Sequence, residues 1–312
     1  MSGRLAPSPT GELHLGGAST FLVAWLEARS RGVPLLLRVE DLDAARVAPH
    51  AEARILDDLA WLGLAWDGAP ARQSTRGAAY EAALAALDAA GLVYPCDCSR
   101  AEVARIASAP HEGDEVRYPG TCRDKPRDRA FRRAPALRFA VTPGALVAFV
   151  DGLRGPQRER VDLRAGDFVL RRGDGVFAYQ LAVVVDDLEM GVDHVVRGAD
   201  LLPSTARQIA LARALGGAPP AYLHAPLVVG EDGARLAKRA AGVTVRDHRA
   251  AATSPEALVG ELARRLGLSG GAPTTPAALL ATYDRARLTR GPVRAWGPGA
   301  AATRDLTQER AG

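Results

Sequence analysis

The chain alternates short, continuous apolar runs with longer stretches in which apolar residues recur every three or four positions. The runs have the length of buried strands, and the longer stretches have the spacing of helices. We expect strands at residues 3–6, 34–40, 92–95, 137–141, 146–150 and 194–197. We expect helices at residues 16–31, 48–62, 75–90, 204–215 and 255–266, and a strand followed by a helix within 176–190. This alternation predicts an α/β fold built on a doubly wound parallel sheet.

Residues 96–135 interrupt the alternation, because they are polar, rich in arginine and without a clear period. Such a segment is typical of a loop-rich insertion and not of a sheet core. We therefore expect the α/β domain in two halves, 1–95 and 136–250, followed by a short helical or irregular C-terminal region at 251–312. The last dozen residues have a composition typical of disorder, and the sequence contains no internal repeat.

Composition narrows the class of protein without naming a function. The hydrophobic content of 47% and the charged content of 24% are those of an ordinary globular protein. The formal net charge of +4 permits a polyanionic partner but does not require one. The three cysteines do not resemble a secreted disulfide framework, and no apolar leader or membrane-spanning stretch is found. We expect a cytoplasmic protein that does not enter a membrane.

The loop between the first expected strand and the first expected helix has the chemistry of a phosphate site. A helix begins with unpaired N–H groups and the positive end of its dipole, and both attract anions. Gly16 and Gly17 allow a nucleotide to approach the backbone closely, and His14 can donate a hydrogen bond to a phosphoryl oxygen. For such a loop in isolation, a Gly-Pro turn with an incidental surface histidine is the simpler explanation.

This loop is not isolated, because three runs together resemble the opening of glutamyl-tRNA synthetases. They are Gly3-Arg4-Leu5-Ala6-Pro7-Ser8-Pro9-Thr10-Gly11, then His14-Leu15-Gly16-Gly17, then Leu37-Arg38-Val39-Glu40-Asp41-Leu42-Asp43. The resemblance implies a class I synthetase fold of the Rossmann type, with the loop as the first class I signature. The ATP-binding residues that it implies here are Pro7, Ser8, Thr10, Gly11, His14, Gly16 and Gly17. Gly17 stands where the general class I pattern has a histidine, a difference that the glutamyl group shares.

Residues 228–239 (VVGEDGARLAKR) form a turn followed by a basic cluster. The cluster resembles the second class I signature, with Lys238 at the position of its key lysine. An ammonium there offsets the charge that develops as pyrophosphate departs, so Lys238 joins the ATP site and, with His14, is an implied catalytic residue. Ala237 and Arg239 replace a serine and a small polar residue of the pattern, which bears on loop closure and rate. Taken alone, a solvated basic turn is the commoner explanation.

The runs FAYQLAVVVDD at 177–187 and VVRGAD at 195–200 resemble the glutamate-pocket segments of the same family. By this resemblance Arg4 and Arg197 contact carboxylates, Glu40 holds the ammonium and Tyr179 supplies a hydroxyl. The implied pocket is completed by Ala6 and Ser8. An arginine fork matches a carboxylate in two hydrogen bonds, which suits the substrate. The alternative is an Arg38–Glu40 ion pair at a strand end, with Tyr179 in the core.

The three cysteines have spacings that suggest a structural zinc site. Cys96 and Cys98 are two residues apart, and Cys122 lies 24 residues beyond Cys98. Thiolates are preferred zinc ligands, and three of them leave one tetrahedral position to fill. Ligand statistics favour His111 for that position, with Tyr118 and the carboxylates of Asp97, Glu112 and Asp114 as further candidates. A resemblance to the glutamyl-queuosine tRNA(Asp) synthetases, which carry Cys-x-Cys and then Tyr-x-x-x-Cys, favours Tyr118 instead. Three reduced cysteines without a metal remain an alternative.

The same subfamily is favoured by the 74 residues that follow Lys238, which look too sparse for the anticodon-reading domains of ordinary glutamyl-tRNA synthetases. It implies ATP-dependent formation of glutamyl-adenylate and transfer of the glutamyl group to queuosine in tRNA(Asp), with Mg²⁺ accompanying the ATP. The expected partners are ATP, L-glutamate and tRNA(Asp) carrying queuosine, and we expect a monomer. Two alternatives are a truncated glutamyl-tRNA synthetase that charges a tRNA 3′ end, and a non-catalytic zinc module that binds nucleotide or RNA.

Overall fold

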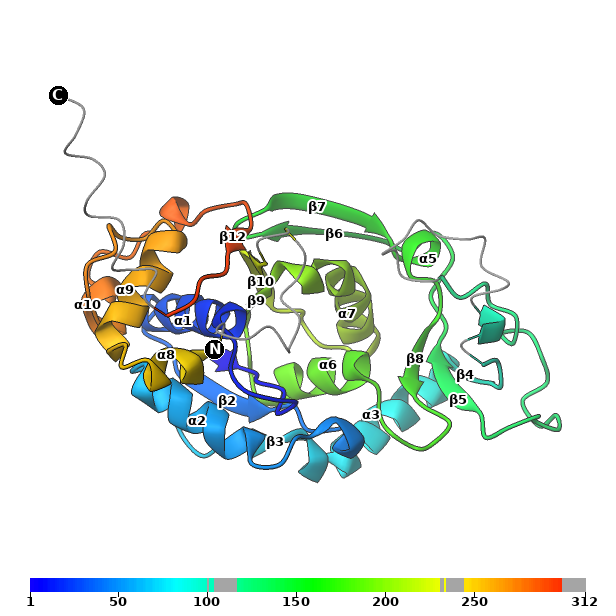
Figure 1. Ribbon diagram of the computed structural model, residues 1–312. Coiled ribbons are helices and arrows are strands. Elements are labelled where there is room, and N and C mark those ends of the chain that lie inside the picture. Colours follow the sequence, from blue (N-terminus) through cyan, green and yellow to red (C-terminus); the bar gives the residue numbers. More distant parts are fainter. Residues whose placement is uncertain (100, 104–116, 231–232, 234–243, 299–312) are drawn as a thin grey trace.

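The computed structural model describes residues 1–99, 101–103, 117–230, 233 and 244–298. Parallel strands form its centre, in two groups (Figure 1). The first group is β1 (Gly3–Leu5), β2 (Leu35–Val39) and β3 (Ala71–Arg72), paired in that order. The second is β9 (His194–Gly198), β10 (Ala221–Ala225) and β6 (Leu146–Asp151), with β7 (Gly155–Arg160) antiparallel at the β6 edge. A parallel bridge between Ser2 and Val192 joins the groups.

Helices cover both faces of this sheet. Along β9 and β10, Val196 and Leu223 belong to one apolar core, whereas their neighbours Val195 and Tyr222 belong to a second core. Because successive side chains of a strand point to opposite faces, the two cores lie on opposite sides of the sheet. The first core contains α1 (Leu15–Ser30) and α2 (Ala51–Trp61), and the second contains α3 (Gly77–Ala89), α6 (Tyr179–Glu189) and α7 (Leu202–Ala214). The central sheet is thus doubly wound, as expected.

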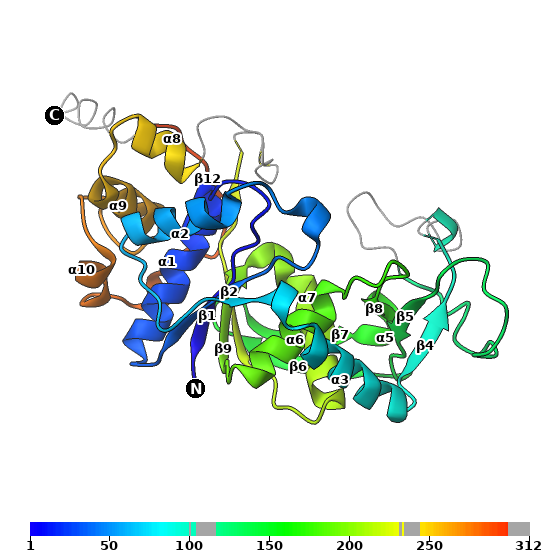
Figure 2. The ribbon, with the colours of Figure 1, turned by 90° about the horizontal axis from the view of Figure 1, so that it is seen from below.

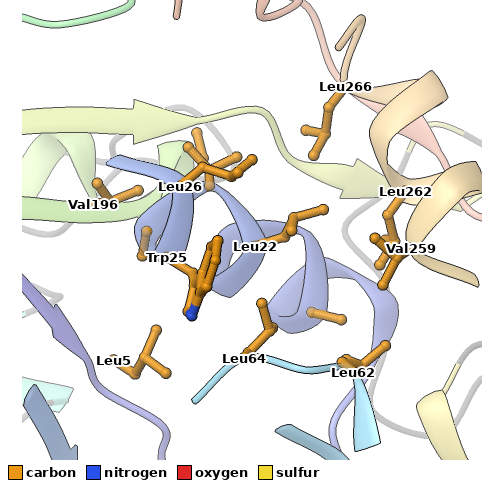
Figure 3. Packing of buried hydrophobic residues seen from close by; sticks show 14 of the residues in the cluster. Leu5, Leu22, Trp25, Leu26, Leu62, Leu64, Val196, Val259, Leu262 and Leu266 are labelled. Atoms are coloured by element: carbon orange, nitrogen blue, oxygen red, sulfur yellow. The ribbon is translucent and has the colours of Figure 1, made fainter. Parts of the chain in front are cut away.

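Helix α1 is apolar on nearly every side, which predicts a helix enclosed by other elements. Figure 3 shows Leu22, Trp25 and Leu26 of α1 among side chains from the sheet and from the C-terminal region. That region contributes α8 (Val245–Ala250), α9 (Pro255–Arg265) and α10 (Pro276–Leu280). The helix expected at 255–266 is confirmed, while α8 and α10 were missed. The segment therefore completes the first core, although its sparse apolar pattern did not predict this.

One acidic side chain lies inside this apolar packing. Glu27 of α1 is buried and accepts hydrogen bonds from Tyr283 (2.5 Å) and from Arg285 Nε (2.8 Å), with His194 Nε2 at 3.2 Å. Burial alone would raise the pKa of Glu27, but His194, Arg285 and Tyr283 together outweigh it and lower the pKa to about 2. The cluster therefore ties α1, the start of β9 and the C-terminal segment together as an ionised, satisfied group.

A second sheet departs from the sequence expectation. β4 (Val93–Cys96), β5 (Ala136–Phe139) and β8 (Phe168–Arg171) pair antiparallel. Figures 1 and 2 show this sheet at one end of the molecule and α8 to α10 at the other. The expectation of a purely parallel sheet is therefore wrong for this part. The strand expected at the start of 176–190 is also wrong, because Phe177 makes only an isolated bridge to Arg171 before α6 begins at Tyr179.

The remaining elements are short. They are α5 (Val161–Arg164), β11 (Val228–Val229), β12 (Val293–Arg294) and the 3-10 turns Ala44–Arg46, Gln73–Thr75, Ala199–Leu201 and Arg285–Arg287. Strands β7, β8 and β10 were not predicted from the sequence. The dozen terminal residues expected to be disordered lie outside the described residues. Within the described part, no helix has both the length and the apolar character to cross a membrane.

Candidate active site

A cavity of about 240 Å³ lies at the carboxyl ends of β1, β2 and β9. Ligands of open α/β sheets bind at this edge, outside the ends of the parallel strands. Eight of the residues singled out in the sequence line this one cavity: Arg4, Ala6, His14, Gly16, Gly17, Glu40, Tyr179 and Arg197. They come from segments up to nearly 200 positions apart, so the fold brings together what the motifs only suggested. Their individual roles stay predictions.

A larger groove of about 1120 Å³ adjoins the cavity, because Glu40 and Tyr179 line both spaces. Ser8 and Thr10, expected at the ATP and glutamate sites, line the groove, which extends to Cys98 and Tyr118 of the cysteine cluster. Pro7 and Gly11 line neither of the two spaces, although the Pro7 carbonyl accepts a hydrogen bond from the Glu40 N–H at 2.9 Å. Lys238, with its neighbours Ala237 and Arg239, lies outside the described residues.

His14 caps the first turn of α1. Its Nδ1 accepts a hydrogen bond from the Gly17 N–H at 3.0 Å, so in the neutral ring the proton resides on Nε2. A Cβ at residue 17 would lie 2.8 Å from Leu13 Cδ1, so a larger residue there would have to displace the end of the Leu13 side chain. The loop is held from outside by a bridge between His14 and Thr244. The geometry presents an N–H donor and a close backbone at a helix N-terminus, as an anion site requires.

Beneath the cavity lies a network of buried charges that the sequence motifs did not reveal. Arg38 is fully buried and donates to Asp187 at 2.6 Å and to Glu40 at 3.1 Å, with Asp186 at 3.7 Å from its Nε. Arg4 lies 3.5 Å from Asp187. The Arg38–Glu40 ion pair proposed as the simple alternative thus exists, and Glu40 lines the cavity as well.

This network sets the electrostatics of the cavity. Burial raises the pKa of Glu40, and the opposing charges of Arg38 and Arg4 reduce that rise. Burial likewise lowers the pKa of Arg4, against the attraction of Asp187, and raises the pKa of Tyr179. Two arginines and two carboxylates, those of Glu40 and Asp200, line this small space. The arginines can pair with the carboxylates of a ligand, and an acidic side chain can accept hydrogen bonds from its ammonium. The cavity is therefore suited to an acidic amino acid.

Arg197 is held from the protein interior by three hydrogen bonds. Its Nε donates to His224 at 3.1 Å, Nη1 to Gln208 at 2.6 Å and Nη2 to Thr205 at 2.8 Å. Sequence reasoning missed all three partners, and it quoted Asp186 and Asp187 without a role. A signal existed for the acidic pair, since two carboxylates at the end of an apolar helical run must meet cations if they are buried. His224 stands in the short run AYLHA, where nothing marks its function.

The cysteine cluster lies where the antiparallel sheet meets the 117–122 segment. The Sγ atoms of Cys96, Cys98 and Cys122 lie within 4.8 Å of one another. The Tyr118 hydroxyl lies 3.3 Å from Cys96 Sγ and 3.7 Å from Cys98 Sγ. Four candidate ligand atoms thus converge, as tetrahedral coordination requires. Gly166 allows this approach: it has a φ of +61°, and a Cβ there would lie 2.6 Å from the Tyr118 carbonyl oxygen.

Asp97 is the other described candidate for the fourth ligand. Asp97 lies 3.5 Å from Cys122 through Oδ1, but its oxygens accept hydrogen bonds from Arg129 at 3.2 Å and from the Arg132 N–H at 3.1 Å. The remaining candidates, His111, Glu112 and Asp114, lie outside the described residues. Among the described residues, the Tyr118 hydroxyl is thus the oxygen best placed among the sulfurs. The set of three thiols and a phenol fits a soft, tetrahedral ion.

Comparisons with known proteins agree with this geometry. A chain from Symbiobacterium thermophilum named "Glutamyl-Q tRNA(Asp) synthetase" is 51% identical over 310 residues, covering 94% of this chain and 95% of its own. A protein of the same name from Nocardia farcinica is 52% identical over 295 residues, covering 93% and 92%. A crystal structure of a glutamate tRNA ligase from Elizabethkingia meningosepticum in complex with its amino acid superimposes with a TM-score of 0.79 at 25% identity. The match covers 94% of this chain but only 66% of that longer one. The family model for class I tRNA synthetases (E and Q), catalytic domain, matches residues 1–275, and the chain belongs to this family.

Proposed function

We propose that this chain activates L-glutamate with ATP and transfers the glutamyl group to queuosine in the anticodon of tRNA(Asp), as a ligase that forms an aminoacyl ester. The convergence of Arg4, Glu40, Tyr179 and Arg197 on one cavity beside the His14 loop carries the proposal. The name shared by relatives that are about half identical over nearly the whole chain supports the choice of acceptor.

In the first step a carboxylate oxygen of glutamate attacks the α-phosphorus of ATP, and pyrophosphate leaves. Arg4 and Arg197 hold carboxylates, Glu40 accepts hydrogen bonds from the ammonium, and Tyr179 contributes its hydroxyl. His14 donates through Nε2 to a phosphoryl oxygen, and Lys238 offsets the charge that builds on the leaving group. Mg²⁺ bound with ATP supplies further positive charge to the phosphates. These fixed charges act more strongly beside the protein than they would in bulk water, because the effective dielectric constant there is lower.

In the second step a hydroxyl of the cyclopentene-diol of queuosine attacks the carbonyl carbon of glutamyl-adenylate. An ester bond forms, AMP leaves and the hydroxyl proton is released. The larger groove begins at Glu40 and Tyr179, next to the activated carbonyl, and its volume of about 1120 Å³ offers room for an acceptor nucleoside. Transfer therefore requires no movement of the activated amino acid out of its pocket.

The cysteine cluster has a separate, structural role in this proposal. Cys96, Cys98, Tyr118 and Cys122 hold a Zn²⁺ ion, which pins together the insertion at 96–135 that separates the two halves of the catalytic domain at 1–95 and 136–250. The ion provides folding energy and takes no part in activation. The described part of the C-terminal region, 251–298, then serves to cover α1. We expect the chain to act as a monomer in the cytoplasm.

Two assays test the proposal. Exchange of labelled pyrophosphate into ATP should depend on L-glutamate and should not require tRNA; no exchange would favour a non-catalytic module. Labelled glutamate should then be offered to tRNA(Asp) with queuosine, tRNA(Asp) without queuosine, and tRNA(Glu). We expect label only on the first. Equal labelling of both forms of tRNA(Asp) would refute queuosine as the acceptor, and labelling of tRNA(Glu) alone would favour charging of a 3′ end.

A further inference from the structure

Three adjacent parallel strands place three charged or polar side chains in a row behind the cavity. Arg197 of β9 and His224 of β10 are register partners, and Asp151 ends β6, the next strand. His224 is fully buried, and its Nε2 lies 3.1 Å from Arg197 Nε. Its Nδ1 lies 2.6 Å from Asp151 Oδ2. The row runs from the sheet interior to a residue that lines the cavity.

The row determines which nitrogen of His224 carries the proton. A guanidinium N–H can only donate, so His224 Nε2 must accept from Arg197, and the ring proton resides on Nδ1. Asp151, an acceptor when ionised, receives that proton in a hydrogen bond. Asp151 is itself held, because its Oδ1 accepts from the N–H groups of Leu153 at 3.0 Å and Arg154 at 2.8 Å. The backbone thus holds Asp151, Asp151 fixes the position and tautomer of His224, and His224 in turn holds the Arg197 guanidinium.

The consequence for Arg197 follows from counting donors. A guanidinium has five N–H groups, and within the described part three of them are taken by His224, Gln208 and Thr205. One N–H on each terminal nitrogen remains, and these N–H groups are the donors that Arg197 can offer to a carboxylate in the cavity that it lines. If the Arg197 guanidinium were free to rotate, these N–H groups would no longer be held toward the carboxylate.

We propose that Asp151 and His224 are positioning residues that orient the Arg197 guanidinium toward the carboxylate of the amino-acid substrate. The inference rests on the proposed function for the identity of that substrate. The groups that face His224 are Asp151 from β6, Arg197 from β9, Arg154 from the β6–β7 turn, Thr205 from α7 and the stacked ring of Tyr222. Burial lowers the pKa of His224, against the hydrogen bond that its Nδ1–H donates to Asp151, and this direction favours the neutral ring that accepting from Arg197 requires.

The test compares variants in glutamate-dependent ATP–pyrophosphate exchange, with separate KM values for glutamate and ATP. His224→Ala should raise the KM for glutamate by about tenfold or more, because a hydrogen bond to a charged group is lost, and should leave the KM for ATP unchanged. His224→Gln should restore most of the affinity, since its amide oxygen can accept from Arg197. Asp151→Asn should also raise the KM, because an amide N–H facing Nδ1 reverses the tautomer and sets two donors against each other.

His248→Ala is the matched control, since His248 is also buried but meets the Trp296 ring edge-to-face in the C-terminal region. It should lower Tm without changing the KM for glutamate. Folded His224 and Asp151 variants with wild-type KM would overturn the positioning role. If the KM values for glutamate and for ATP both rose in proportion to the loss of Tm, the Asp151–His224 row would have only a structural role. Calorimetric binding of L-glutamate to the wild-type chain separates failure of the positioning role from failure of the proposed activity. Glutamate binding without ATP–pyrophosphate exchange would refute the reaction, but the glutamate affinities of the variants could still be compared.

Discussion

Replacing Arg38 by methionine should destabilise the chain more than the loss of any surface arginine. Arg38 is fully buried and lies within 3.7 Å of three carboxylates, those of Asp186, Asp187 and Glu40. The exposed fractions of these side chains are 0%, 8% and 11%. Methionine fills a similar volume but leaves the acidic groups without their common cation. Removing one partner of a buried ion pair typically costs about 3–5 kcal/mol, mostly because the remaining charges are buried and uncompensated.

This cost translates into a measurable change of Tm. Unfolding entropy is about 2.1 cal/mol/K per residue, so for 312 residues a loss of 3–5 kcal/mol lowers Tm by about 5–8 °C. Thermal unfolding followed by circular dichroism is the assay. Arg72→Met is the matched control, because Arg72 donates to Glu52 at the same distance of 2.6 Å but is nearly half exposed. Its loss should change Tm far less, since exposed pairs contribute little.

The pH dependence provides a second check with a definite sign. Burial already raises the pKa of Glu40, and without Arg38 the main charge that opposes this rise is lost, so the pKa of Glu40 in the folded state lies further above that of the unfolded chain. The folded state then binds more protons than the unfolded state, so its stability relative to the wild type rises as pH falls. The difference in Tm should therefore narrow between neutral pH and about pH 5. Equal Tm values for Arg38→Met and Arg72→Met, or a difference independent of pH, would refute this account of the network.

Three further predictions concern activity and metal content. Because burial raises the pKa of Glu40 above its ordinary value of 4.5, the KM for glutamate should rise as pH falls through that raised pKa. Glu40→Gln should have a high KM that does not rise further at low pH; if its KM still rose as in the wild type, another group would be responsible for the pH dependence. Lys238→Ala should slow ATP–pyrophosphate exchange about 100-fold or more with Tm retained, since one electrostatic contact to the transition state is lost; an unchanged rate would show that the second signature has been misplaced. Cys122→Ser should lower the zinc content measured by atomic absorption together with Tm, and Tyr118→Phe should weaken zinc binding less; full zinc content in Cys122→Ser would contradict the proposed ligand set.

Local patterns in the sequence predicted much of the architecture and the outline of the site. The first loop, its helix and the strand that ends before Glu40 follow one another closely, so periodicity indicated strand, loop and helix. The anion site and the pocket residues followed from the resemblance to glutamyl-tRNA synthetases. Strand β7 escaped detection because its residues, GPQRER, form no apolar run, and β8 because its apolar run, Phe168-Val169-Leu170, is shorter than that of a typical buried strand. The C-terminal region looked sparse because its apolar residues are scattered along the chain. Packing against an already apolar α1 collects them into a core.

The charges behind the site show where the limit of sequence reasoning lies. By itself the sequence determined the α/β class, the positions of most helices and the motif residues that line the cavity. Only the tertiary structure decided that Arg38 meets Asp187, 149 positions away, and that His224 connects Asp151 to Arg197. The physical reason is that a buried charge is tolerated only beside its partners, and those partners come from other strands and helices. Periodicity reports on neighbours along the chain, whereas the pairing of strands across the sheet determines which distant side chains share a low-dielectric interior.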